Sequence, residues 1–234
     1  MADAGQVGTA WLLGAFHANH YATHLVPDDH PEWQDVNRMI NDGDPEHTGY
    51  FPPAFYGYYD LGRTIPALKT PPPLFRGYCG VPILTAACAE VLRRFDLGRT
   101  TLHPIELLKQ DRKTPVLKGD YVGMLPGEYR ERVVPQATSL RLKHVGGTTP
   151  PRYNTYCDVT DDAIALSPEA LEPPDLWIDR RLIDRMFVTD RLGEALVEAG
   201  WRDVMKLTRC RVVDADGGEG EEGRSPPAPS LPGS

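Results

Sequence analysis

The spacing of apolar residues predicts two short helices that share one local pattern. Each helix begins at a threonine, Thr85 or Thr189, whose side chain can cap the first turn. Apolar residues then recur on one face, as Leu84, Cys88, Val91, Leu92 and Phe95 in the first helix and as Leu192, Ala195, Leu196 and Ala199 in the second. Gly98 and Gly200 follow at positions where a glycine can end a helix.

Each predicted helix leads into a segment with a strand-like pattern, 102–108 after the first and 204–213 after the second. Two interpretations of this similarity are open: a repeated β–α–β unit, or two ordinary capped helices. Further strands are predicted at 11–16, 140–145 and 153–159. The sequence therefore predicts an α+β fold with a mixed, largely antiparallel sheet and two short capped helices packed on it.

The chain is long enough for one large domain, and we expect a single domain over residues 1–213, best supported over 74–213. Residues 1–9 are small and polar, and we expect them to be frayed. Residues 214–234 are rich in Gly, Glu, Pro and Ser with almost no apolar content. Such a composition cannot offset the entropy of ordering, so we expect a disordered acidic tail.

The formal charge of −8 argues against a nucleic-acid-binding protein, which needs a basic face toward phosphate. The charge is concentrated in a stretch with one base, Arg38, and seven acids: Asp28, Asp29, Glu32, Asp35, Asp42, Asp44 and Glu46. The tail carries five more acids and one base, and Asp3 is a further acid, which leaves residues 47–213 at +3. The acidic stretch is either a solvated loop or a docking surface for a basic protein partner.

The four cysteines show no CxxC spacing and lie among apolar neighbours, which favours buried free thiols in a reducing compartment. The apolar run 10–16 is too short to span a bilayer. We therefore expect a cytoplasmic protein without a membrane span.

Three histidines form the one candidate metal site in the sequence, because His17, His20 and His24 would share one face of a helix. Asn19, Tyr21 and Thr23 do not favour a helix there, so a surface cluster without a bound ion is the favoured interpretation. A metal-dependent enzyme that uses these histidines, for instance to reverse a modification made by a toxin, is the alternative function.

Several short segments resemble a myxobacterial-type immunity-protein family, whose members occur beside polymorphic and contact-dependent bacterial toxins. The resemblance covers residues 74–213 and rests mainly on Asp175-Leu176-Trp177, on Phe187 to Leu192, on Ala195-Leu196 and on Cys210-Arg211-Val212. Leu74-Phe75-Arg76 and the helix from Thr85 fit the same layout.

The resemblance implies a cytoplasmic immunity protein that binds a cognate toxin, occludes it and protects the producing cell and its kin. Such a protein is not an enzyme and needs no cofactor. The motif residues would then be scaffold: Asp175, Trp177, Phe187, Thr189, Asp190, Leu192 and Leu196. Asp175 and Asp190 would brace the helix unit, and Trp177 and Phe187 would pack beneath it. A third hypothesis is an adaptor that recruits partners through the tail 214–234.

Overall fold

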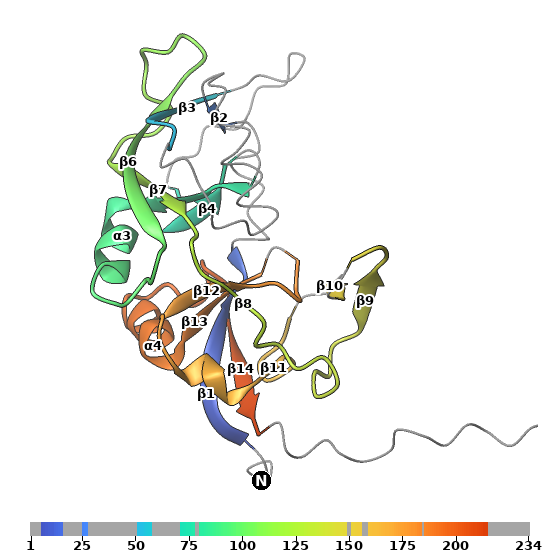
Figure 1. Cartoon of the computed structure of the whole chain (residues 1–234). Coiled ribbons are helices and arrows are strands. Elements are labelled where there is room, and N and C mark those ends of the chain that lie inside the picture. The colour runs from blue at the N-terminus through green and yellow to red at the C-terminus, as the bar shows by residue number, and fades with distance from the viewer. Residues whose placement is uncertain are drawn as a thin grey trace, which may run out of the picture.

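Two six-stranded sheets and two short helices make up most of the described chain, which in this computed structural model comprises residues 6–15, 25–27, 51–57, 71–77, 80–148, 151–155, 159–183 and 185–214 (Figure 1). Sheet I has the order β2-β3-β6-β7-β5-β4. Its strands are β2 (Leu25–Pro27), β3 (Ala54–Gly57), β4 (Leu74–Arg76), β5 (Pro82–Thr85), β6 (Thr101–Leu108) and β7 (Tyr121–Leu125). Helix α3 (Ala86–Leu92) connects β5 to β6.

Sheet II has the order β11-β14-β1-β13-β12-β8. Its strands are β1 (Gln6–Leu13), β8 (Tyr129–Arg130), β11 (Ala165–Leu166), β12 (Leu176–Asp179), β13 (Met186–Thr189) and β14 (Leu207–Val213). Helix α4 (Asp190–Glu198) connects β13 to β14, and a short 3₁₀ helix, η3 (Pro168–Leu171), precedes β12. The strands β9 (Leu142–Val145) and β10 (Arg152–Thr155) form a separate hairpin.

The two sheets repeat the same arrangement of five strands. β3-β6-β7-β5-β4 in sheet I corresponds to β11-β14-β1-β13-β12 in sheet II. In both runs the first pair is parallel and the next three pairs are antiparallel. The equivalent of β7 in sheet II is β1, which comes from the other end of the described chain (Figure 1).

The register of the strands repeats as well. Thr85 pairs with Tyr121 at the end of β5, and Thr189 pairs with Ala10 at the end of β13. The Thr85 N–H donates to the Pro73 carbonyl at 3.0 Å, and the Thr189 N–H donates to the Asp175 carbonyl at the same distance. The similarity of the two helix segments is therefore a repeated topology. The α+β class with mixed, largely antiparallel sheets and two short helices is confirmed.

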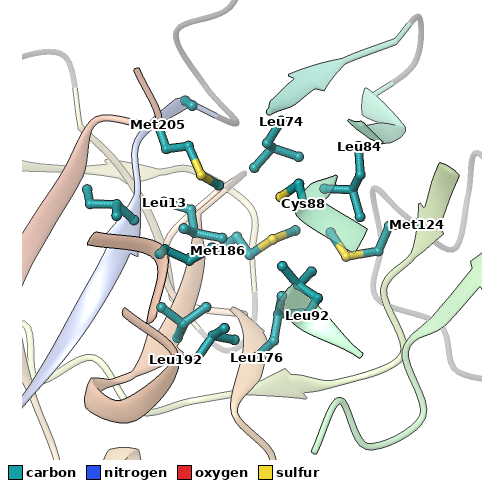
Figure 2. Close-up of a cluster of buried hydrophobic side chains, with 14 of the residues drawn as sticks. Leu13, Leu74, Leu84, Cys88, Leu92, Met124, Leu176, Met186, Leu192 and Met205 are labelled. Atoms are coloured by element: carbon teal, nitrogen blue, oxygen red, sulfur yellow. The ribbon is translucent and has the colours of Figure 1, made fainter. Parts of the chain in front are cut away.

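Each sheet with its helix forms one of two repeated units: sheet I with α3, and sheet II with α4. One hydrophobic core is shared by both units. Alternate residues of the central strands point into it from sheet I and from sheet II, and α3 and α4 both contribute to it. Figure 2 shows side chains of the two units meeting there. Its buried members are Trp11, Leu13, Ala15, Leu74, Leu84, Cys88, Ala89, Leu92, Val122, Met124, Leu176, Ile178, Met186, Val188, Leu192, Leu196, Met205 and Leu207.

The outer face of each sheet has a core of its own. Phe75, Ile83 and Tyr121 lie on the outer face of sheet I with the buried Phe51 and Phe55. Phe51 and Phe55 belong to a run of aromatic residues in the sequence, and in the structure both are part of the core. On sheet II the outer core contains the stacked rings of Trp177 and Phe187.

The helix ends follow the predicted pattern in part. Thr85 caps α3, because its hydroxyl accepts the Cys88 N–H at 3.4 Å. Gly200, at φ +78°, ends α4 in a Schellman motif, with its N–H donating to Val197 and the Trp201 N–H donating to Leu196. The prediction for Gly98 is wrong, since α3 ends at Leu92 and Gly98 lies in the following turn.

Three other local predictions are corrected. Thr189 makes no side-chain cap to α4, and its hydroxyl donates to Asp175 Oδ1 at 2.6 Å. Ala199 is exposed and so does not belong to the buried stripe of α4. The first strand begins at Gln6 rather than at Trp11, since residues 6–10 pair with the end of β14 and are not frayed.

We predict that Leu92→Ala and Leu196→Ala each lower the free energy of unfolding by about 2–5 kcal/mol, because each leaves a cavity in the shared core. Val204→Ala is the matched control: Val204 is 43% exposed, so its truncation should cost less than about 0.5 kcal/mol. Urea unfolding measures all three values. Equal losses in the core and control variants would contradict a core shared by both units.

Candidate functional site

The predicted partner-binding and metal-binding residues lie outside the described residues. This holds for the acidic set Asp28, Asp29, Glu32, Asp35, Asp42, Asp44 and Glu46, and for His17, His20 and His24. Their roles stay predictions. Within the described ranges, no group of three or more His, Cys, Asp or Glu side chains is placed to hold a metal ion.

Asp175 is the most heavily engaged residue of the family-like motif. Its buried carboxylate accepts hydrogen bonds from the Thr189 hydroxyl at 2.6 Å and from Arg191 Nε and Nη2 at 2.5 and 2.6 Å. It also accepts the Asp96 N–H at 2.9 Å, while its own N–H donates to the Asp96 carbonyl at 2.6 Å. Because Asp96 follows α3 and Thr189 precedes α4, Asp175 links the two units.

Opposing effects set the pKa of Asp175. Burial alone would raise it, but the hydrogen bonds from Arg191, Thr189 and the Asp96 amide lower the pKa below its ordinary value. The carboxylate is thus held in its charged form. Its arrangement stabilises the junction of the units and offers no proton for chemistry near neutral pH.

The other motif residues also make structural contacts. Asp190 Oδ1 accepts a hydrogen bond from Trp11 Nε1 at 2.9 Å, which joins the first turn of α4 to β1. Leu192 and Leu196 are buried in the shared core. Trp177 stacks on Phe187 with ring centroids 5.8 Å apart, and the Arg132 guanidinium lies 5.3 Å from the Trp177 ring centroid.

Asp179, at the end of β12, is a second buried carboxylate that the sequence analysis did not single out. It accepts backbone N–H groups of Arg132 at 2.7 Å, Val133 at 2.9 Å and Arg181 at 2.8 Å. Burial raises its pKa although these three donors act in the opposite direction. The visible signal was an acid ending an otherwise apolar strand, Leu176-Trp177-Ile178-Asp179.

Glu128 is the third buried carboxylate, and it holds the turn that contains Gly98. Its Oε1 accepts the Arg99 N–H at 2.9 Å, and its Oε2 accepts Arg130 Nη2 at 2.7 Å. Gly98 has a φ of +58°, and a Cβ there would lie 2.6 Å from Glu128 Oε1. Only glycine fits this position.

The two described cysteines are poor nucleophiles. Cys88 and Cys210 are both buried and free. Burial raises the pKa of Cys88 to about 12, and it raises the pKa of Cys210 as well. Since the thiolate is the reactive form, both thiols serve packing.

Comparisons with known proteins add no relative: no protein-family model matches the chain, and no curated protein matches it. The resemblance to immunity proteins therefore stays a prediction. No helix in the described part of the chain is long and apolar enough to cross a membrane.

We predict that Asp175→Ala lowers the free energy of unfolding by about 2–3 kcal/mol, since the Thr189 hydroxyl and the Asp96 amide lose a buried acceptor. The bond to Arg191 adds little, because that side chain is 59% exposed. Asp190→Ala is the control and should cost about 1 kcal/mol, as it removes one partly buried hydrogen bond, from Trp11 Nε1. Chemical unfolding compares the two variants, and equal losses would refute the linking role of Asp175.

The pH dependence of the same site provides a second measurement. Because the folded-state pKa of Asp175 is lowered, its contribution to stability is complete above its unfolded pKa of about 4 and is lost as the pH falls through the folded pKa. Asp175→Asn removes this contribution at all pH values. The stability difference between the unmodified protein and Asp175→Asn should therefore shrink on acidification below about pH 4.

Proposed function

We propose that this protein is a cytoplasmic immunity protein that binds a cognate bacterial toxin and blocks it by occlusion. One observation supports binding rather than chemistry. Each buried carboxylate among the described residues, Glu128, Asp175 and Asp179, is held by hydrogen bonds that fix the fold. A carboxylate that takes part in catalysis would instead face a substrate.

The uneven charge supports a basic toxin surface as the partner. The stretch 28–46 carries seven of the acidic residues with a single base. An acidic surface of this kind speeds association with a basic protein and can cover a cleft that binds nucleic acid. The protein itself would bind no nucleic acid and need no cofactor.

Co-expression with the toxin encoded beside this protein tests the proposal. We expect growth to be rescued, and we expect a one-to-one complex when a catalytically inactive toxin is used for pull-down. The truncated chain 1–213 is the matched control, because an adaptor that works through its tail would lose activity, whereas an occluding inhibitor would keep it. A folded toxin that is neither bound nor neutralised would overturn the proposal.

Metal analysis separates the proposal from the metal-dependent enzyme. Protein purified without a histidine tag should contain less than about a tenth of an equivalent of transition metal, because a true site binds stoichiometrically. A full equivalent that is lost in a His17→Ala, His20→Ala double variant would favour the enzyme.

We predict that charge reversal at Asp28, Asp29, Glu32 and Asp35 lowers the association rate with the toxin at low salt by about tenfold or more, because it removes electrostatic steering. Reversal of four tail acids, Asp216, Glu219, Glu221 and Glu222, changes the net charge equally and is the control. Stopped-flow association at several salt concentrations measures the effect. If the two variants slow association alike, the steering comes from net charge and not from the stretch 28–46.

A further inference from the structure

The hairpin of β9 and β10 is attached to the segment that follows β12 in sheet II by one isolated bridge, Tyr153 to Leu182. The Tyr153 N–H donates to the Arg181 carbonyl at 2.7 Å, and the Ile183 N–H donates to the Tyr153 carbonyl at 3.0 Å. β10 is thereby fixed beside the segment that follows β12. β9 then lies on the far side of β10, as the outermost strand (Figure 1).

These bonds determine where the backbone groups of β9 point. The N–H and C=O groups of Tyr153 both bond to the segment after β12 and so face away from β9. Tyr153 lies opposite His144 in the ladder, and these two residues therefore form a pair without hydrogen bonds between them. In an antiparallel ladder such pairs alternate with hydrogen-bonded ones, which places Leu142 in the same class. The N–H and C=O groups of Leu142 and His144 therefore all point outward from the hairpin.

None of these four outward groups has a hydrogen-bond partner among the residues that the structure describes. The strand is nevertheless held in place from behind. Leu142 packs against the outer core of sheet II, and the His144 ring contacts the Tyr153 ring with centroids 5.9 Å apart. β9 is thus a supported edge whose row of donors and acceptors can pair with another strand.

The charged residues within the hairpin have one sign. Residues 139–155 contain Arg141, Lys143 and Arg152 and no acid, in a chain with a net charge of −8. Arg141 and Lys143 are exposed. Antiparallel pairing of β9 with a second copy would bring these cations together, since like charges directly opposite each other are unfavourable.

We propose that β9 is a docking edge for an extended, acidic segment of the toxin, which adds to it as a further strand. This inference rests on the proposed function and specifies one contact of the same complex. The four outward backbone groups of Leu142 and His144 supply the hydrogen bonds, and the exposed Arg141 favours acidic side chains. The basic surface covered by the stretch 28–46 would be a different part of the toxin.

His144→Pro tests the backbone pairing directly. Proline removes the outward N–H and is tolerated at an edge position where that N–H faces solvent. His144→Ala is the matched control, because it keeps the N–H. In pull-down and titration with inactive toxin, His144→Pro should weaken binding at least tenfold and His144→Ala less than threefold.

The outcomes separate this inference from the function on which it rests. Unmodified protein that fails to bind the toxin overturns both. Tight binding by His144→Pro overturns only the docking edge, and equal weakening by both variants shows a side-chain contact in place of strand addition. A concentration-dependent dimer that His144→Pro abolishes would assign the edge to a second copy and would also overturn the proposal.

Amide hydrogen exchange provides a measurement that does not depend on a variant. The amides of Leu142 and His144 should exchange rapidly in the free protein and at least tenfold more slowly in the complex. Unchanged exchange at both positions would contradict strand addition. Arg141→Glu should weaken binding and reduce its salt dependence, whereas Arg94→Glu, an exposed cation beyond α3, should change neither.

Discussion

Burial of apolar side chains between the two sheets is the interaction on which the rest of this structure depends. Among the described residues, each unit has one α-helix on its sheet, and neither α-helix is longer than nine residues. Helices of that length are marginal in water without tertiary packing. The shared core provides the packing for both, so the two units stabilise each other.

Asp175 orients the units that the core holds together. Apolar contacts have little directionality, whereas hydrogen bonds fix distances and angles. By joining Asp96, in the loop after α3, to Thr189, just before α4, the Asp175 carboxylate sets how the two repeats meet. The equivalent position in sheet I is Pro73, which keeps the backbone acceptor but has no side chain that could act in this way. The repeat is therefore symmetric in topology and asymmetric in its polar contacts.

Local features of the fold were accessible from the sequence, because they depend on neighbouring residues. The Thr85 cap, the Gly200 helix end and the fold class are examples. The predictions that were wrong concern features that depend on residues distant in the sequence. The predicted Thr189 cap of α4 is absent, and the hydroxyl donates to Asp175, which the pairing of β12 with β13 brings beside it. The position of Gln6 at the start of β1 follows from pairing with Val213.

The candidate site was predictable to a smaller degree. Residue type and charge indicated which acids were candidates for a surface and which for scaffold, and the buried position of Asp175 agrees with a scaffold role. The engagement of Asp179 and Glu128 by backbone donors from distant segments leaves no pattern of spacing in the sequence. The outward groups of β9 could not be predicted either, since every backbone has such groups and only the strand order reveals which have no partner among the described residues.

The central place of β1 in sheet II has a consequence for how the chain could be reconnected. Gln6 lies beside Val213 on adjacent antiparallel strands, so a short loop could join the end of β14 to the start of β1. If the chain were opened after β1, the repeated elements would run in the order β3, β4, β5, α3, β6 and β7, and then β11, β12, β13, α4, β14 and β1. These are two consecutive units with the same connectivity. Such a circular permutant would turn a repeat that is interleaved along the chain into a tandem one, and it would remove the longest loop closure in folding.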